Sequence, residues 1–316
     1  MPKNSNIINK EQEHQQYENQ YDEQMVRKYT GKSKYLSLKD DQNITTLKFV
    51  DELDLQELHV YFCYNINLTR VPLRLTDLHF ISCNIQKIEG LRQMLQLTKL
   101  SIYNNSTRIH LQELKYLTNL KYLHLDRCKL IDITPINLLI NLQNLNLSRN
   151  NLYDINPLRN LKNLLELELV ENNIVDISPL QDLVQIQRMA LSNNPIIHIQ
   201  ALRNFTELFA LNVSQTFIQD LSPIQNHQLR NEYEIYDLKI PTQDQIQHSL
   251  NYLYIKYLEV MLIKYENSKT QFKNKIHVFN KKITKPYKGA VKNQNRFSEK
   301  LAILFKQIEV DATFEQ

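Results

Sequence analysis

The chain has 316 residues, of which 42% are hydrophobic and 23% are charged, and a formal net charge of +4. This length supports a sizeable core, and the apolar and charged fractions are those of a soluble globular protein. Only three glycines are present, which argues against glycine-rich phosphate-binding loops.

Targeting signals are absent from the part of the sequence where they would be expected. Residues 1–30 are polar and lack the apolar core of a signal peptide, and no run of 18 apolar residues occurs. The three cysteines are odd in number and lack metal-binding spacing. We therefore expect a reduced, cytoplasmic protein.

The first two segments precede the regular part of the chain. Residues 1–34 form a polar leader, compatible with either a disordered segment or a short amphipathic helix that Gly31 would end. Residues at helical spacing in it are Tyr17, Tyr21, Met25 or Val26, and Tyr29. Residues 35–54 are expected to form an N-terminal cap of two short strands joined by a polar turn.

Residues 55–228 hold a leucine pattern, LxxLxLxx(N/C/T)x(I/L)xxI, whose successive starts are 20, 22, 23, 22, 22, 22 and 22 residues apart. The eight starts are Leu55, Leu75, Leu97, Leu120, Leu142, Leu164, Ile186 and Leu208. A fixed period in this range is typical of leucine-rich repeats. The Leu-x-Leu alternation predicts short strands with one buried face, and Asp-Ile-x-Pro-Leu segments such as 154–158 predict tight or 3₁₀ turns.

This pattern resembles the 22-residue class of leucine-rich repeats, which includes internalins and the leucine-rich regulatory subunit of protein phosphatase 1. The resemblance covers residues 44–225. It implies an α/β solenoid, a right-handed superhelix with short parallel strands on its concave face and 3₁₀ or irregular segments on its convex face. The matched residues are mostly buried ones, so no partner-contact residues are carried over from the phosphatase subunit. A phosphatase is nevertheless one candidate partner.

The ninth position of each repeat forms a single column that contains all three cysteines. Its members are Cys63, Cys83, Asn105, Cys128, Asn150, Asn172, Asn194 and Thr216. In the family that the chain resembles, this column is an internal ladder whose side chains satisfy backbone groups of the turn after each strand. We expect the same structural role here, with buried free thiols. Redox or metal chemistry at these cysteines is the alternative.

The fifth position of each repeat forms a second column, on the exposed side of the predicted strands. Three of the nine histidines fall in the first half of this column, and aromatic residues flank them. The candidate partner-binding residues on this concave face are His59, Tyr61, Phe62, His79, Tyr103, Tyr122, His124 and Glu168.

Three interpretations fit this cluster. We adopt a protein-binding surface, because clustered aromatic side chains supply rigid contact area. The second is a strand surface that merely tolerates aromatic residues. The third is a metal site at His59 and His79, which lacks a third nearby ligand and a carboxylate second shell in this pattern, so we expect no metal and no cofactor.

Residues 229–316 are expected to form a C-terminal cap and a helical, lysine-rich extension. Apolar residues at helical spacing between 246 and 265 predict a strong helix. Residues 268–300 contain ten Lys or Arg and one acidic residue, a net charge of +9 that leaves −5 for the rest of the chain. This segment is either a solvated tail or an anchor to an anionic membrane or nucleic acid, and the scarcity of Arg argues against nucleic acid.

No phosphate-binding, zinc-protease or serine-hydrolase motif occurs in the sequence. The sequence therefore predicts a non-catalytic scaffold or adaptor that binds a protein on its concave face. Recruitment to an anionic surface through residues 268–300 is the alternative function.

Overall fold

The computed structural model describes residues 23–29, 31, 34–44, 46–64, 66, 68, 71–85, 88–218 and 220–225, and the backbone of 233–234. The chain divides into two compact units, Met1–Leu250 and Asn251–Gln316, and the described residues all belong to the first. The predicted helical extension and the basic segment 268–300 lie outside the described residues, as does most of the polar leader.

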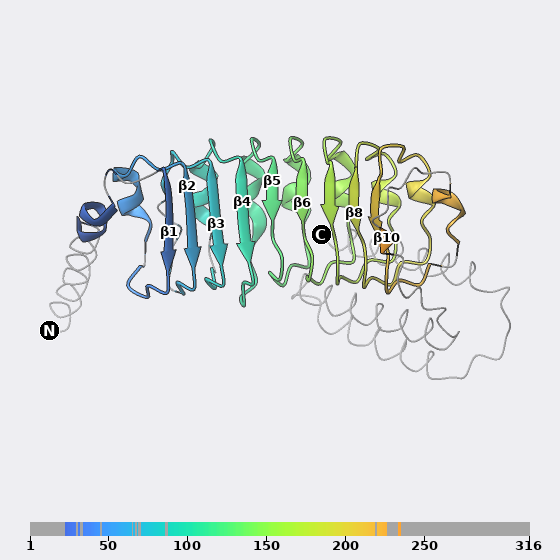
Figure 1. The fold of residues 1–316 in the computed structure, drawn as a ribbon, viewed down its shortest axis with the longest axis horizontal. Coiled ribbons are helices and arrows are strands. Elements are labelled where there is room, and N and C mark those ends of the chain that lie inside the picture. The colour runs from blue at the N-terminus through green and yellow to red at the C-terminus, as the bar shows by residue number, and fades with distance from the viewer. Residues whose placement is uncertain are drawn as a thin grey trace, which may run out of the picture. The chain divides into compact units, whose positions relative to one another are not determined.

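Ten parallel strands of the described chain form one sheet, in chain order (Figure 1). The strands are β1 (Tyr35–Lys39), β2 (Glu57–Tyr61), β3 (Asp77–Ile81), β4 (Lys99–Tyr103), β5 (Tyr122–His124), β6 (Asn144–Asn146), β7 (Glu166–Glu168), β8 (Arg188–Ala190), β9 (Ala210–Asn212) and β10 (Tyr233–Glu234). Each pairs with its neighbour at equivalent repeat positions, so that Leu123, Leu145 and Leu167 stand opposite one another. The repeat period in the sequence thus becomes the strand register.

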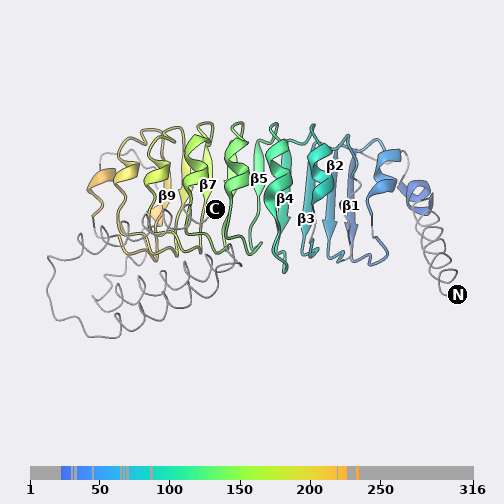
Figure 2. The same cartoon turned by 180° about the vertical axis from the view of Figure 1, so that it is seen from behind.

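Short 3₁₀ helices carry the chain back on the opposite side of the sheet, as Figure 2 shows. They are η1 (Lys48–Glu52), η2 (Glu89–Gln93), η3 (Leu111–Tyr116), η4 (Thr134–Leu138), η5 (Asn156–Asn160), η6 (Ser178–Leu180), η7 (Gln200–Leu202) and η8 (Ser222–Ile224). Four of them, η4, η5, η6 and η8, have Pro as their second residue, and its fixed φ suits a first helical turn. Before each of these four an Asp accepts a hydrogen bond from a backbone N–H, as Asp154 does from Asn156 at 2.9 Å. The expected 3₁₀ turns are confirmed.

A single hydrophobic core fills the space between the strands and the 3₁₀ helices, from Met25 to Ile224. Leucines at the repeat starts and at the inward strand positions are almost fully buried, for example Leu142, Leu145 and Leu147 at 0% exposure. Each repeat contributes only one short strand and one short turn, so its apolar face is covered by the two adjacent repeats. The chain therefore has the leucine-rich repeat fold that its sequence pattern predicts.

Both ends of the array differ from the boundaries expected from the sequence. The expected pair of capping strands within residues 35–54 is wrong: β1 joins the parallel sheet, and residues 48–52 form η1. This segment is one more repeat, since Tyr35 pairs with Glu57 at the regular step and Leu36 and Leu38 are buried. At the other end β10 adds a strand beyond residue 228. Degenerate terminal repeats still complete the core because they keep the inward apolar positions.

Part of the polar leader is ordered against this first repeat. Residues 23–29 are helical, Met25 is buried, and Val26 and Tyr29 pack against the core. Gly31 follows with φ +73°, a left-handed conformation that suits a residue ending a helix. Of the two interpretations of the leader, the helix that covers the first repeat holds for these residues.

The internal ladder connects each repeat to the one before it. The side chain of Asn172 shows the pattern: Nδ2 donates to the carbonyl oxygens of Leu147 and Leu169 at 3.0 and 3.1 Å, and Oδ1 accepts from the N–H of Leu152 at 3.1 Å. Asn150 and Asn194 make equivalent bonds. The amide thus satisfies buried backbone groups of two repeats that water does not reach.

Cysteine and threonine make fewer bonds at the same position. The thiol of Cys128 donates to the carbonyl oxygen of Ile102 at 3.0 Å, that of Cys83 to Val60 at 3.3 Å, and that of Cys63 to Tyr61 at 3.2 Å. Thr216 donates to Val213 at 2.6 Å. A thiol or hydroxyl cannot donate and accept across two repeats as the asparagine amide does. The repeats with Cys or Thr at this position therefore rely more on packing.

A left-handed residue follows the strand in nearly every repeat. Its φ lies between 52° and 56° in Asp40, Phe62, Ser82, Asn104, Arg127, Arg149, Glu171, Asn193 and Gln215. Glycine would be the ordinary choice for this conformation, yet none of these residues is glycine. Backbone N–H groups at these positions donate to the next repeat, as Phe62 does to Ile81 and Ser82 to Tyr103. Pairing between repeats therefore fixes the turn.

Replacing a ladder asparagine should destabilise the array. We expect Asn172→Ala to lower the free energy of unfolding by about 2–4 kcal/mol, because it leaves buried backbone groups of Leu147, Leu152 and Leu169 without that partner. The control is Asn163→Ala, which removes one bond to Ile140 at the surface and should cost less than about 1 kcal/mol. Urea unfolding followed by circular dichroism measures both, and equal effects would contradict the bridging role.

The three thiols should be inert in the folded protein. Burial raises the pKa of Cys63 to about 11 and that of Cys128 to about 12, and it also raises the pKa of Cys83. The thiolate is the reactive form, so a disulfide reagent at pH 8 should label none of them before unfolding and all three in denaturant. Rapid labelling of a native thiol would show that this column is reactive rather than structural.

Candidate functional site

The candidate site is the outward face of the sheet, here called the strand face, made by the first, third and fifth residues of the long strands and their equivalents. Within β2 and β3 these side chains are half-buried, while the residues between them are buried. The alternation follows from the strand geometry, which points successive side chains to opposite sides. The strand face is therefore a set of parallel columns, and within each column the residues of adjacent strands lie about 4.8 Å apart.

The N-terminal part of this face brings two histidines into direct contact. His59 and His79 are register partners on β2 and β3, and their ring centroids are 4.2 Å apart with the planes tilted by 48°. His59 also contacts Glu57, whose Oε1 lies 2.7 Å from its Nε2, and Tyr61, whose hydroxyl lies 3.1 Å from its Nδ1. Tyr35 from β1 closes this group, with its ring edge against His59 at 5.1 Å.

The surroundings of His79 favour its neutral form. The pKa of His79 is lowered to about 4, mainly by burial and next by the neighbouring His59. The carboxylates of Glu57 and Asp77 act the other way but are weaker influences. At neutral pH the imidazole of His79 therefore carries a lone pair and no charge.

A second group forms a continuous chain of hydrogen bonds from β4 to β7, which an ion pair extends to β8. The Tyr103 hydroxyl lies 2.8 Å from Nδ1 of His124, and Nε2 of His124 lies 2.6 Å from Oδ1 of Asn144. Asn144 donates through Nδ2 to Glu166, and Arg188 on β8 forms an ion pair with the same carboxylate at 3.7 Å. Five strands thus contribute one polar side chain each.

The direction of these hydrogen bonds follows from the carboxylate. Glu166 only accepts, so Asn144 turns its NH₂ group toward it and its oxygen toward His124. Nε2 of His124 then carries the proton, and Nδ1 accepts from the Tyr103 hydroxyl. Burial raises the pKa of Tyr103, which keeps this hydroxyl a donor. Each side chain in this row of hydrogen bonds therefore has a fixed orientation.

Charged and aromatic groups pair beside this chain. Lys99 forms an ion pair with Asp77 at 3.3 Å and lies over the Tyr122 ring at 5.6 Å. In the second half of the sheet Arg149 contacts Asp126 and Glu171, at 3.5 and 3.4 Å. Burial raises the pKa of Asp126, and the charge of Arg149 opposes that shift. The strand face is thus a mosaic of mutually paired groups rather than a field of one sign.

The structure separates the sequence-predicted site residues into distinct groups. It brings His59, Tyr61 and His79 together, and it brings Tyr103 to His124; buried Ser101 stands between the two groups in register. Of the others, Tyr122 contacts Lys99, and exposed Glu168 accepts a hydrogen bond from Asn146 at 2.7 Å.

Phe62 is the remaining sequence-predicted site residue. It occupies the left-handed position immediately after β2, with φ 55°. The sequence pattern did not reveal this, because the conformation depends on backbone pairing with the next repeat.

Several strand-face residues were missed by the sequence analysis. Glu57 and Asp77 occupy the column two residues before the histidines, and Asn144, Glu166 and Arg188 continue it. The available signal was the Glu-x-His spacing at residues 57–59, which puts both side chains on one face of a strand. The stated objection to a metal site, the lack of a third ligand, is therefore wrong for His59 and His79.

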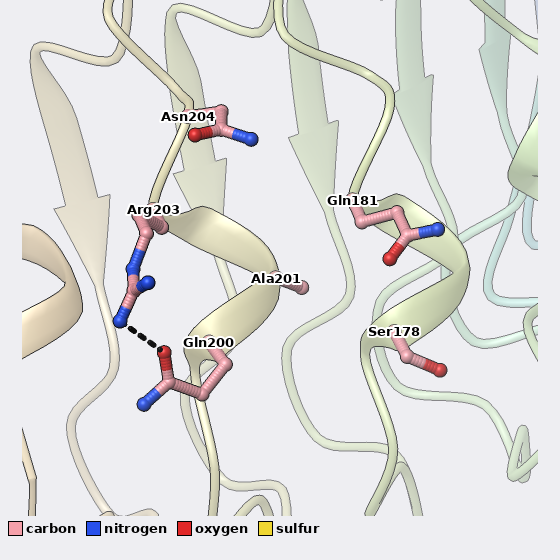
Figure 3. A pocket seen from close by; sticks show the side chains of 6 residues that line it. All are labelled: Ser178, Gln181, Gln200, Ala201, Arg203 and Asn204. Carbon is pink, nitrogen blue, oxygen red and sulfur yellow. Dashed lines mark hydrogen bonds between the residues drawn. The ribbon is translucent and has the colours of Figure 1, made fainter.

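The opposite side of the array carries an open hollow of about 300 Å³ between η6 and η7 (Figure 3). Its lining residues are Ser178, Gln181, Gln200, Ala201, Arg203 and Asn204. Arg203 donates to Gln200 at 3.2 Å, and Ser178 pairs with Asp176. The lining offers one cation and several amides without a convergent reactive group, so the strand face is the stronger candidate.

Several polar side chains of the strand face are hydrogen-bonded to one another. Two tyrosine hydroxyls stand beside histidines, Tyr61 beside His59 and Tyr103 beside His124, and the other ring nitrogen of each histidine contacts Glu57 or Asn144. Among the described residues no helix has the length and apolar character needed to cross a membrane.

The solved structures that this chain resembles include internalins and a leucine-rich repeat protein. No family model matches the chain, and no curated protein does. Among solved structures, an internalin from Listeria monocytogenes shares 27% identity over 59% of this chain and 62% of its own, with a TM-score of 0.47. Internalin C2 from the same organism shares 25% identity over 61% of this chain and 77% of its own, with a TM-score of 0.48.

A leucine-rich repeat protein from Leptospira interrogans shares 20% identity over 66% of this chain and 62% of its own, with a TM-score of 0.48. The chain thus spans less than two thirds of the length of two of these three proteins.

The hydrogen bond between Tyr103 and His124 should couple the two side chains energetically. In a double-mutant cycle with Tyr103→Phe and His124→Ala, we expect an interaction of about 0.5–1.5 kcal/mol in the free energy of unfolding. Tyr103→Phe combined with His198→Ala, an exposed histidine, should be additive. Additivity in the first cycle would show that this bond is absent in solution.

Proposed function

We propose that this protein is a non-catalytic scaffold or adaptor that binds a protein partner on its strand face. The observation that carries the proposal is the fixed arrangement of aromatic and polar side chains across β2 to β8. Binding loses less entropy when the contacting groups are already held in place, as Tyr103 and His124 are here.

The composition of this face suits a protein ligand. Tyrosine and arginine are the residues that most often dominate binding energy at protein interfaces, and Tyr61, Tyr103, Tyr122 and Arg188 all lie on it. Charges of both signs are interspersed, as in the Lys99–Asp77 and Arg188–Glu166 pairs. Such a mosaic supports specific docking of a protein more than capture of a uniformly charged polymer.

A phosphatase is one candidate for that partner, on family resemblance alone. We also propose a cytoplasmic location. The three free, buried thiols support it, because disulfides are the common state of paired cysteines in oxidising compartments.

Affinity capture from the native cell extract, followed by a binding titration with the purified partner, tests the function. We expect the triple variant Tyr61→Ala, Tyr103→Ala, Tyr122→Ala to bind the partner at least about 100-fold more weakly, because it removes three aromatic contact groups. The repeat fold should persist, since Tyr61 and Tyr103 are only half-buried and Tyr122 is exposed; circular dichroism checks this.

The control places the same number of truncations on the other side of the array. Tyr116→Ala, Leu138→Ala, Ile140→Ala removes side chains that are 47–53% exposed there, and it should leave the affinity within a factor of about three. Loss of binding in this control but not in the strand-face variant would move the site to the 3₁₀ side and overturn the proposal.

A further inference from the structure

One cluster in the described part of the chain brings together two imidazoles and a carboxylate, each with a ligand atom to offer. Glu57, His59 and His79 place these atoms within 4.8 Å of one another, and all three side chains are half-buried. Glu57 and His59 are two residues apart on one face of β2, and His79 is the register partner of His59 on β3. Their approach is thus set by the sheet itself rather than by a flexible loop.

The distances suit a small divalent ion. Zinc binds nitrogen and oxygen at about 2.0–2.2 Å, so two of its ligands in a tetrahedral site lie about 3.3 Å apart. Nε2 of His59 and Oε1 of Glu57 are 2.7 Å apart, as a hydrogen-bonded pair. Side-chain rotations that shift these atoms by about 1.5 Å or less reach the coordination geometry.

Tyr61 supplies the outer support that a metal-bound histidine needs. Without a metal, His59 donates through Nε2 to the Glu57 carboxylate and accepts from the Tyr61 hydroxyl at Nδ1. A hydroxyl can also accept, so the tautomer with the proton on Nδ1 keeps its partner at 3.1 Å and frees Nε2 as a ligand. The same two neighbours therefore serve both states of His59.

The next carboxylate along the sheet is engaged elsewhere. Asp77, the register partner of Glu57, pairs with Lys99 at 3.3 Å and accepts a hydrogen bond from Thr98 at 3.3 Å. On the strand face Glu57 pairs with His59. Glu57 is consequently the carboxylate that turns toward the two imidazoles.

We propose that Glu57, His59 and His79 form a binding site for a divalent transition metal, best matched by Zn²⁺. Two imidazoles and one carboxylate are a donor set that zinc accepts, and hard cations such as Mg²⁺ and Ca²⁺ prefer oxygen ligands alone. Three protein ligands leave the fourth tetrahedral position facing solvent on the strand face. Water or a side chain of a bound protein would complete the coordination.

Calorimetric titration of ZnCl₂ into the untagged, chelator-stripped full chain tests the site. We expect one Zn²⁺ per chain at this site, with affinity lowered at least about 100-fold in each of Glu57→Gln, His59→Gln and His79→Gln. Tyr61→Phe removes only the outer support and should weaken binding roughly 10- to 100-fold. No partner protein is needed, so the outcome is independent of the proposed scaffold function.

Two matched controls make the same kind of substitution at residues outside the proposed site. Asp77→Asn neutralises the neighbouring carboxylate, and His198→Gln removes an exposed imidazole far along the chain. Both should bind Zn²⁺ as the wild type does. Zn²⁺ should also raise the unfolding temperature of the wild type and of both controls, and not that of the three ligand variants, because binding to the folded state alone stabilises it.

Three outcomes would overturn the proposal. The first is wild-type protein that binds no Zn²⁺. The second is binding that survives His59→Gln and His79→Gln, which would place the ion on other residues. The third is Zn²⁺ binding that is lost in the two histidine variants but has unchanged affinity in Glu57→Gln. The site would then be a histidine pair without a carboxylate ligand.

Discussion

The structure depends on one requirement: buried backbone groups at the turn after a strand need partners, and adjacent repeats provide many of them. Asn150, Asn172 and Asn194 bridge these groups with one amide each, and backbone N–H groups of the left-handed residues pair with the repeat that follows. This is why a chain with three glycines forms a turn that usually favours glycine, since the pairing holds φ near +55° for residues as unlike as Phe62 and Glu171.

The regular arrangement of side chains on the strand face follows from this pairing between repeats. Because the repeats keep one register, side chains from adjacent strands lie close enough to pair. The hydrogen bonds from Tyr103 to Glu166 have one self-consistent direction, and an ion pair joins Glu166 to Arg188. A rigid sheet also explains how Glu57, His59 and His79 converge without a loop to position them. Binding to such a face costs little reorganisation, which is the physical basis for proposing both a protein partner and a metal at this surface.

The sequence pattern predicted the buried part of the protein more completely than the exposed part. The period of 22 residues predicted the strands, the 3₁₀ turns and the ladder column, because inward positions admit few side chains and recur visibly. It failed at the ends: residues 35–54 were expected to form a separate cap, yet Leu36 and Leu38 serve there as Leu58 and Val60 do in β2. A degenerate repeat keeps its inward apolar positions and loses the rest of the motif. It therefore still adopts the repeat fold when its sequence no longer matches the pattern.

The sequence by itself determined the repeat, its register, and which columns of residues face outward, since strand alternation and a constant period leave no freedom in these. Only the tertiary structure decided which neighbours in those columns touch. Glu57 pairs with His59 and lies near His79, Asp77 pairs with Lys99, and Phe62 takes a left-handed conformation after β2. The physical reason is that column membership follows from one strand, whereas contact depends on the rotamers and charges of three adjacent strands at once.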